Sequence, residues 1–239
     1  MGSYLNPGNL SFRGSLRSKI YVDKSELICR TNEVLFTEQK YICVSRPRRF
    51  GKSMAANMLS AYYDRNENTE ELFHNLAISK DKTYKENLNR YDVIKLNMQE
   101  FLSMSDTIEE MLGMIRNYLI SDFQETFPDV RFRDKQNLIQ VMKDVFSYTK
   151  CPFIILIDEW DCLFREYKQN KEAQKKYLDF LRAWLKDKDY VALAYMTGIL
   201  PIKKYGSHSA LNMFTEYSMT NPREMAAVSY THLRAHETA

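Results

Sequence analysis

Long apolar runs are missing from this chain: none approaches the roughly 20 residues that a helix needs to cross a bilayer. The N-terminus also lacks the apolar segment of a secretory signal peptide. A strong excess of one charge is absent too, because the net charge of +3 is too small to argue by itself for nucleic acid or a membrane surface. Together these absences predict a cytoplasmic protein without a membrane partner.

Cysteine is scarce as well. The four cysteines, Cys29, Cys43, Cys151 and Cys162, are scattered, and no pair has the spacing of a metal knuckle or a redox motif. This usage fits a reducing compartment with ordinary buried thiols. Internal repeats and low-complexity tracts are also missing. What remains is a chain of 239 residues with 44% apolar content, enough for one α/β domain or two small ones.

A loop rich in arginine is the most informative segment. It reads Arg46, Pro47, Arg48, Arg49, Phe50, Gly51, Lys52, Ser53 and Met54. It follows a strand-like apolar run at 41–44 and opens a helix-like stretch that ends near residue 63. A strand, a tight loop with Gly-Lys-Ser and a helix form the Walker A arrangement, in which loop N–H groups and a helix N-terminus hold phosphates. We therefore expect these residues to bind a nucleotide, with Lys52 on the terminal phosphates and Ser53 on Mg²⁺.

This loop departs from the Walker A consensus. Arg46 stands where the consensus has glycine, and Pro47 removes one backbone donor. The three arginines could neutralise phosphate charge, offer an arginine finger to a neighbouring subunit, or pair with acids and solvent. We expect one of them to lie near a phosphate, but the sequence does not say which one.

A second segment has the pattern of a Walker B element. The continuous apolar run at 153–157 predicts a strand buried on both faces, and it ends in Asp158 and Glu159. At the carboxyl end of a strand, Asp158 would hold Mg²⁺ and Glu159 would be the catalytic base that polarises an attacking water. Thr197 follows another apolar run, 191–196, and is expected to orient that water. The alternative is a buried strand that simply ends in solvated acids.

The apolar pattern alternates between strands and helices. Strands are predicted at 41–44, 93–98, 153–157 and 191–196. Helices are predicted at 25–34, 52–64, 69–73, 107–127, 134–148 and 171–186, with Asp134 as an N-cap. This alternation predicts an α/β fold with a parallel sheet and helices on both faces. Ligands bind such sheets at the carboxyl ends of the strands, where the two Walker segments would meet.

Several blocks of the chain resemble the AAA-ATPase-like family of bacterial proteins. The blocks are residues 46–53, Tyr21 to Lys24, Ile157 to Glu159 and Thr197 to Leu200, and the resemblance covers about residues 18–225. It implies a P-loop NTPase fold with three layers, α/β/α, and a mainly parallel sheet of the additional-strand, AAA-like class. It also implies ATP and Mg²⁺ as cofactors, hydrolysis of ATP, and a position for Asp23 and Lys24 near the nucleotide base. The missing first glycine is the rule in this family, so Arg46 does not indicate an inactive site.

Three regions are expected along the chain. Residues 1–20 are predicted to form an irregular arm, and residues 21–226 an AAA-like ATPase domain that is incomplete at its C-terminus. Residues 227–239 are predicted to be a non-native tail, because they resemble a translated sequencing adapter. The family resemblance implies that the natural protein continues into a C-terminal nuclease-like domain. That domain, or a second copy of the chain, is the expected protein partner.

We predict an enzyme, a Mg²⁺-dependent ATPase domain that works as a conformational switch or motor module. Three alternatives stay open. A non-hydrolysing nucleotide-binding scaffold would explain the altered loop, although Glu159 argues against it. A small-molecule kinase would need a lid, which the polar stretch at 65–90 could provide. A DNA-directed defence ATPase with a missing nuclease-like domain would bind nucleic acid, and the sequence leaves that partner open.

Overall fold

A computed structural model describes residues 2–202 and 210–218. Its centre is a five-stranded sheet in the order β2-β3-β4-β1-β5, in which the neighbouring strands are all parallel. The strands are β1 (Tyr41–Ser45), β2 (Asp92–Asn97), β3 (Phe153–Asp158), β4 (Val191–Gly198) and β5 (Thr215–Tyr217). The predicted α/β fold with a parallel sheet is confirmed, and β5 is an addition that the apolar pattern did not indicate.

The strand order brings segments that are distant in the sequence to one edge of the sheet. β4 lies between β1 and β3, so the strands that precede the two Walker segments are not direct neighbours. This is the additional-strand arrangement that the family resemblance implied. The register pairs Ser45 with Gly198 and Ile157 with Met196, so β1, β3 and β4 end at the same carboxyl edge. An open parallel sheet binds its ligands at this edge.

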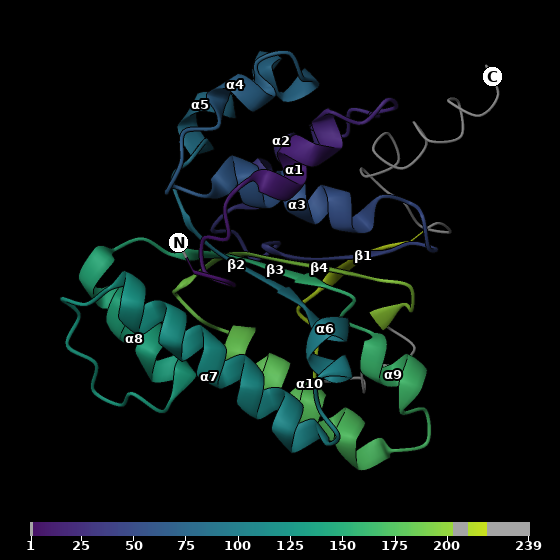
Figure 1. Ribbon diagram of the computed structural model, residues 1–239, viewed down its shortest axis with the longest axis vertical. Coiled ribbons are helices and arrows are strands. Elements are labelled where there is room, and N and C mark those ends of the chain that lie inside the picture. The colour runs from purple at the N-terminus through teal and green to yellow at the C-terminus, as the bar shows by residue number, and fades with distance from the viewer. Residues whose placement is uncertain (1, 203–209, 219–239) are drawn as a thin grey trace.

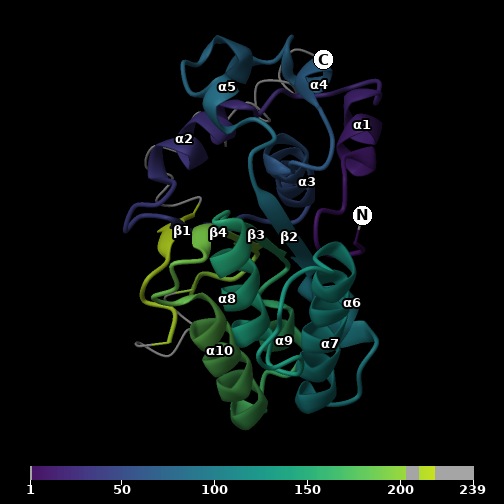
Figure 2. The same cartoon turned by 90° about the vertical axis from the view of Figure 1, so that its left-hand side faces the viewer.

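Helices cover both faces of the sheet (Figure 1). One face carries α1 (Leu10–Leu16), α2 (Glu26–Val34), α3 (Lys52–Tyr63), α4 (Glu70–Phe73), the 3₁₀ helix η1 (Ala77–Lys80) and α5 (Tyr84–Asn87). The other face carries α6 (Met98–Ser103), α7 (Ile108–Thr126), α8 (Leu138–Thr149), α9 (Cys162–Glu166) and α10 (Lys171–Leu185). The view turned by 90° in Figure 2 shows the same layers, which confirms the predicted α/β/α architecture.

Each face of the sheet has its own apolar core, and β3 contributes to both. Ile154 and Leu156 belong to the core on the α3 side, whereas Ile155 and Ile157 belong to the core on the α7 side. A strand buried on both faces has no solvent-facing positions for polar residues, which explains the continuous apolar run at 153–157. This burial also fixes the position of the polar residues that follow the strand.

The N-terminal arm differs from the expectation. The sequence predicts an irregular segment over residues 1–20, but this segment contains α1 and packs against the domain. Phe12 is fully buried and stacks on Phe73, with ring centroids 5.1 Å apart. Leu5 is also buried and forms an antiparallel bridge with Ile94 of β2. Because the partners of these residues lie far away in the sequence, local patterns could not reveal the packing.

The ends of two elements also differ from the prediction. α8 begins after Asp134, because the side chain of Asn137 caps it by accepting a hydrogen bond from the N–H of Gln140 at 3.2 Å. The strand predicted at 93–98 ends at Asn97, whose side chain caps the short helix α6. In both cases a side-chain cap decides where the helix begins.

Two further expectations concern the membrane and the C-terminus. Across residues 2–202 and 210–218, the structure has no helix that is both long enough and apolar enough to cross a membrane. The predicted tail, 227–239, and the predicted domain end at residue 226 lie outside the described residues.

Candidate functional site

A cavity of about 650 Å³ opens near the carboxyl edge of the sheet. Its lining residues are Arg48, Arg49, Gly51, Lys52, Ser53, Met54, Asn97, Gln99, Glu159, Arg165 and Glu166. The lining therefore joins the 46–53 loop and the start of α3 to the end of β2 and to residues that follow β2 and β3. Sites for small molecules typically have volumes of about 300–1,000 Å³, so the cavity is large enough for much of a nucleotide.

The backbone of the 46–53 loop turns sharply before α3. Arg49 and Gly51 have positive φ angles of 68° and 72°, and loops of mixed handedness can direct successive N–H groups toward an anion. Gly51 is the N-cap residue of α3, and no side chain caps this helix. Since the first N–H groups of a helix have no acceptor within it, they are suited to phosphate oxygens. A Cβ at Gly51 would lie 3.3 Å from the Nζ of Lys24, so glycine also permits a close approach.

Lys52 is held beside the cavity by its own loop. Its Nζ donates hydrogen bonds to the carbonyl oxygens of Arg46 at 3.1 Å and Pro47 at 3.0 Å. Burial lowers the pKa of Lys52, while the nearby carboxylates of Glu159 and Asp158 act in the opposite direction. A phosphate would be a stronger partner for this ammonium group than two neutral carbonyls, because both members of that pair are charged.

The three arginines of the loop have different positions. Arg46 is buried, and its Nη1 donates hydrogen bonds to the carbonyl oxygens of Ser45 at 3.1 Å and Tyr217 at 2.9 Å. Its side chain thus ties the loop to β5 and is not part of the cavity lining. Arg48 and Arg49 are exposed and line the cavity. That one loop arginine lies near a phosphate stays a prediction, and Arg48 and Arg49 are the two of the three that line the cavity.

Lys24 supports the loop backbone from the N-terminal segment. Its Nζ donates a hydrogen bond to the carbonyl oxygen of Phe50 at 3.1 Å, and burial lowers the pKa of Lys24. Asp23 instead accepts a hydrogen bond from the N–H of Ala77 in η1 at 2.7 Å. The family resemblance implies that both residues lie near the nucleotide base. In this structure Lys24 contacts the loop backbone, and Asp23 contacts η1 and the N–H of Ser25.

Asp158 and Thr197 are joined across the β3–β4 pair. The Oγ1 of Thr197 donates a hydrogen bond to the Oδ1 of Asp158, which also accepts one from the N–H of Glu159 at 3.0 Å. Both Asp158 and Thr197 are buried. The hydroxyl of Thr197 therefore orients the Asp158 carboxylate in this structure, and its role in orienting water stays a prediction.

Asp158 and Ser53 fit a magnesium site that uses few protein ligands. The hydrogen bonds from the hydroxyl of Thr197 and from the N–H of Glu159 converge on Oδ1 of Asp158, which leaves Oδ2 for a cation or its water shell. Ser53 is exposed and lines the cavity. Mg²⁺ commonly takes one or two protein oxygens and completes its octahedron with water and phosphate oxygens. Among the described residues, no group of three His, Cys, Asp or Glu is arranged to hold a metal by itself.

Glu159 has an unusual backbone conformation and a charged partner. Its φ angle is +54°, a region that costs a non-glycine residue on the order of 1–3 kcal/mol and that occurs preferentially at functional sites. Its Oε2 accepts a hydrogen bond from the Nη2 of Arg165 in α9. The same Nη2 lies 3.3 Å from the Oε1 of Gln99. The expected base thus faces the cavity as one member of an ion pair.

Asp161 connects this region to the end of β4. It is the N-cap residue of α9, and its Oδ2 accepts hydrogen bonds from the N–H groups of Ile199 at 3.0 Å and Leu200 at 2.8 Å. Gly198 is required at this point, because a Cβ there would lie 2.6 Å from the Nε1 of Trp160. The Thr-Gly-Ile-Leu block is therefore fixed against the residues that follow β3.

Sequence reasoning missed Gln99, Arg165 and Glu166, which all line the cavity. The Nε2 of Gln99 donates a hydrogen bond to the Oε1 of Glu166 at 2.7 Å, so the three residues form one polar network. The sequence did contain one signal for Arg165, which follows Asp161 at the i,i+4 spacing of a helical ion pair. In the structure the Nε of Arg165 and the Oδ2 of Asp161 are 3.5 Å apart. Nothing local in the sequence pointed to Gln99.

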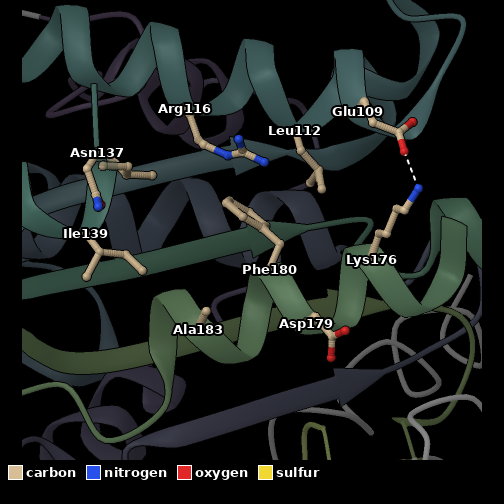
Figure 3. A pocket seen from close by; sticks show the side chains of 10 residues that line it. Glu109, Leu112, Arg116, Asn137, Ile139, Lys176, Asp179, Phe180 and Ala183 are labelled. Carbon is tan, nitrogen blue, oxygen red and sulfur yellow. Dashed lines mark hydrogen bonds and ion pairs between the residues drawn. The ribbon is translucent and has the colours of Figure 1, made fainter. Parts of the chain in front are cut away.

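A second cavity, of about 660 Å³, lies between α7, α8 and α10 (Figure 3). Its lining residues are Glu109, Leu112, Arg116, Asn137, Leu138, Ile139, Lys176, Asp179, Phe180 and Ala183. Lys176 pairs with Glu109, and the guanidinium of Arg116 lies 5.7 Å from the centre of the Phe180 ring. This cavity contains none of the residues expected to bind nucleotide, so we place the candidate site at the first cavity.

A comparison with known families agrees with the resemblance seen in the sequence. Residues 13–207 match a family model described as AAA-ATPase-like, a predicted AAA-ATPase. The matched range contains the 46–53 loop, Asp158, Glu159 and Thr197. No curated protein matches the chain at a significant level.

Proposed function

Because the chain belongs to the AAA-ATPase-like family, a family of predicted AAA-ATPases, we propose that it binds ATP together with Mg²⁺ and hydrolyses the nucleotide. One observation carries this proposal. Lys52 and Ser53 line the same cavity as Glu159, next to a buried Asp158 that two hydrogen bonds orient. A strand that merely ended in solvated acids would not require this convergence of a phosphate loop, a metal ligand and a base.

The residues of the chain divide the reaction between them. The N–H groups at the start of α3 and the ammonium of Lys52 hold the β- and γ-phosphates. Ser53 and Asp158 would hold Mg²⁺, which would neutralise charge on the phosphate oxygens. Glu159 accepts a proton from water as the water oxygen bonds to the γ-phosphorus. The bond from that phosphorus to the bridging oxygen breaks, and ADP and phosphate leave.

We propose that the hydrolysis of ATP drives a conformational switch. The support is the network of hydrogen bonds that leads away from the site, from Asp158 to Thr197 and from Asp161 to Ile199 and Leu200. A change at the phosphates would reach the end of β4 along these bonds. A second copy of the chain, or the nuclease-like domain that the family resemblance implies, would be the recipient of this change.

Kinase activity has less support from the structure than the hydrolysis of ATP. The stretch at 65–90 contains α4, η1 and α5, and its backbone amides at Ala77 and Ile78 are tied to Asp23 and Ser25 beside α2. None of its residues lines the cavity. The stretch therefore packs on α2 in this structure, and it does not form the closed lid over the phosphates that a kinase would need.

Phosphate release from ATP by the purified protein tests the proposal. We expect equal amounts of ADP and phosphate without any added acceptor, and loss of turnover when EDTA removes Mg²⁺. Tight binding of ATP without turnover would instead favour the scaffold. Phosphate transfer that occurs only with an acceptor hydroxyl would favour a kinase, and strong stimulation by DNA would favour a DNA-directed ATPase.

We expect Thr197→Val to raise the Mg²⁺ concentration needed for half-maximal turnover by about 10–100-fold, the usual cost of losing a group that orients a metal ligand. Valine keeps the shape of threonine but loses the hydroxyl that donates to Asp158. Thr149→Val is a matched control, because the Thr149 hydroxyl donates to the carbonyl of Val145 in α8. An unchanged Mg²⁺ requirement with a reduced kcat would show that Thr197 acts on the water instead.

A further inference from the structure

Arg165 is the cation in the cavity whose partner is the expected catalytic base. Its Nη2 donates to the Oε2 of Glu159 and lies 3.3 Å from the Oε1 of Gln99, and its Nε lies 3.5 Å from the Oδ2 of Asp161. The side chain of Arg165 is 18% exposed and lines the same cavity as Lys52. It therefore lines the space in which the phosphates would bind and also contacts two acids that follow β3, Glu159 and Asp161.

The pairing has a consequence for Glu159. A general base must offer an oxygen lone pair to the water that it deprotonates. The Oε2 of Glu159 already accepts a charge-assisted hydrogen bond from Arg165, which holds the carboxylate toward α9. The Oδ2 of Asp161 is meanwhile supplied by two backbone N–H groups, so Asp161 does not depend on Arg165 alone.

The anchoring of Arg165 allows its side chain to change partners while its backbone stays in place. Cys162, Leu163 and Phe164, the residues that precede it in α9, are buried in the core. Gln99 lines the cavity as well and bonds to both Arg165 and Glu166. Since a guanidinium presents five donors in a planar fork that matches carboxylate and phosphate alike, a phosphate oxygen can replace the carboxylate of Glu159.

We propose that Arg165 is a catalytic residue that binds the γ-phosphate of ATP and, by leaving Glu159, releases this carboxylate to act on water. The inference rests on the proposed function and adds a residue that neither the family match nor the sequence motifs assign. ADP has no γ-phosphate, so Arg165 stays on Glu159 when ADP is bound. Discrimination between ATP and ADP therefore depends on Arg165.

The experiment compares the affinities for ADP and for a non-hydrolysable ATP analogue, both with Mg²⁺, by titration calorimetry. Arg165→Ala should lower the affinity for the analogue by about 10–100-fold, as expected for a lost hydrogen bond between charged groups, and leave the affinity for ADP unchanged. It should also lower kcat. Arg165→Lys keeps the charge but loses the fork, so its affinity for the analogue should lie between those of Arg165→Ala and the unmodified protein. Arg182→Ala, on the exposed side of α10, is the control and should bind both nucleotides as the unmodified protein does.

Three results would overturn the inference. Equal weakening of both nucleotides would give Arg165 a structural role, and faster hydrolysis by Arg165→Ala would make it only an inhibitory partner of Glu159. Unchanged affinities for both nucleotides would remove its role in binding the γ-phosphate, while turnover by the unmodified protein would leave the proposed function standing. If the unmodified protein binds neither nucleotide, the proposed function fails and this inference with it. If Arg165→Ala does not fold, as judged by its thermal melt, Arg165→Lys carries the comparison.

Discussion

Glu159→Gln should retain the binding of Mg·ATP and lose about 10²–10⁴-fold in kcat, the usual contribution of general base catalysis. Glutamine has nearly the shape of glutamate, and its amide oxygen can still accept the hydrogen bond from Arg165. What it loses is the ability to take a proton from water. Single-turnover measurements of phosphate release, combined with calorimetric titration of ATP, separate the loss of chemistry from any loss of binding.

The matched control for this variant is Glu172→Gln. Glu172 lies on α10 and pairs with Lys176, outside the lining of the candidate site. The substitution removes the same charge from the protein and should leave kcat unchanged. If Glu159→Gln hydrolyses ATP at the rate of the unmodified protein, Glu159 is not the base, and the chemistry must be assigned to another group in the cavity.

The sequence predicted the sheet well where its strands are buried on both faces. The run at 153–157 can be read directly, because β3 contributes to both cores and has no polar positions. The position of β4 between β1 and β3 agrees with the additional-strand class that the family resemblance implied. β5 was not predicted, because its three residues are only partly buried and carry no apolar pattern.

The site was predictable in its motifs but not in its contacts. The residues of the 46–53 loop, Asp158 and Glu159 could be found because they follow strands at a fixed spacing. Arg46 donates a hydrogen bond to the carbonyl of Tyr217, a residue of the unpredicted strand β5, so this contact could not be foreseen. The ion pair between Glu159 and Arg165 depends on how α9 turns back after β3, which the sequence pattern does not determine.

Lys52→Met should lower the affinity for ATP by at least about 30-fold. Losing one member of a desolvated charge pair costs about 2–5 kcal/mol, and each 1.4 kcal/mol is a factor of ten. The side chain of Lys52 is largely buried, so methionine, which keeps most of the aliphatic stem, is preferable to alanine. Within residues 2–202 and 210–218, the ammonium bonds to two carbonyls of its own loop, those of Arg46 and Pro47, so we expect the fold to survive its removal.

Lys40→Met supplies the matched control for Lys52→Met. Lys40 immediately precedes β1, at the end of the strand opposite the loop, and its Nζ also donates to a backbone carbonyl, that of Lys188, at 3.4 Å. This variant should bind ATP as the unmodified protein does. A calorimetric titration in which Lys52→Met keeps the full affinity, with an unchanged thermal melt, would show that the ammonium of Lys52 does not contact phosphate. Lys52 would then have only a structural role in the 46–53 loop. The main contact on which the nucleotide site in this cavity rests would be missing.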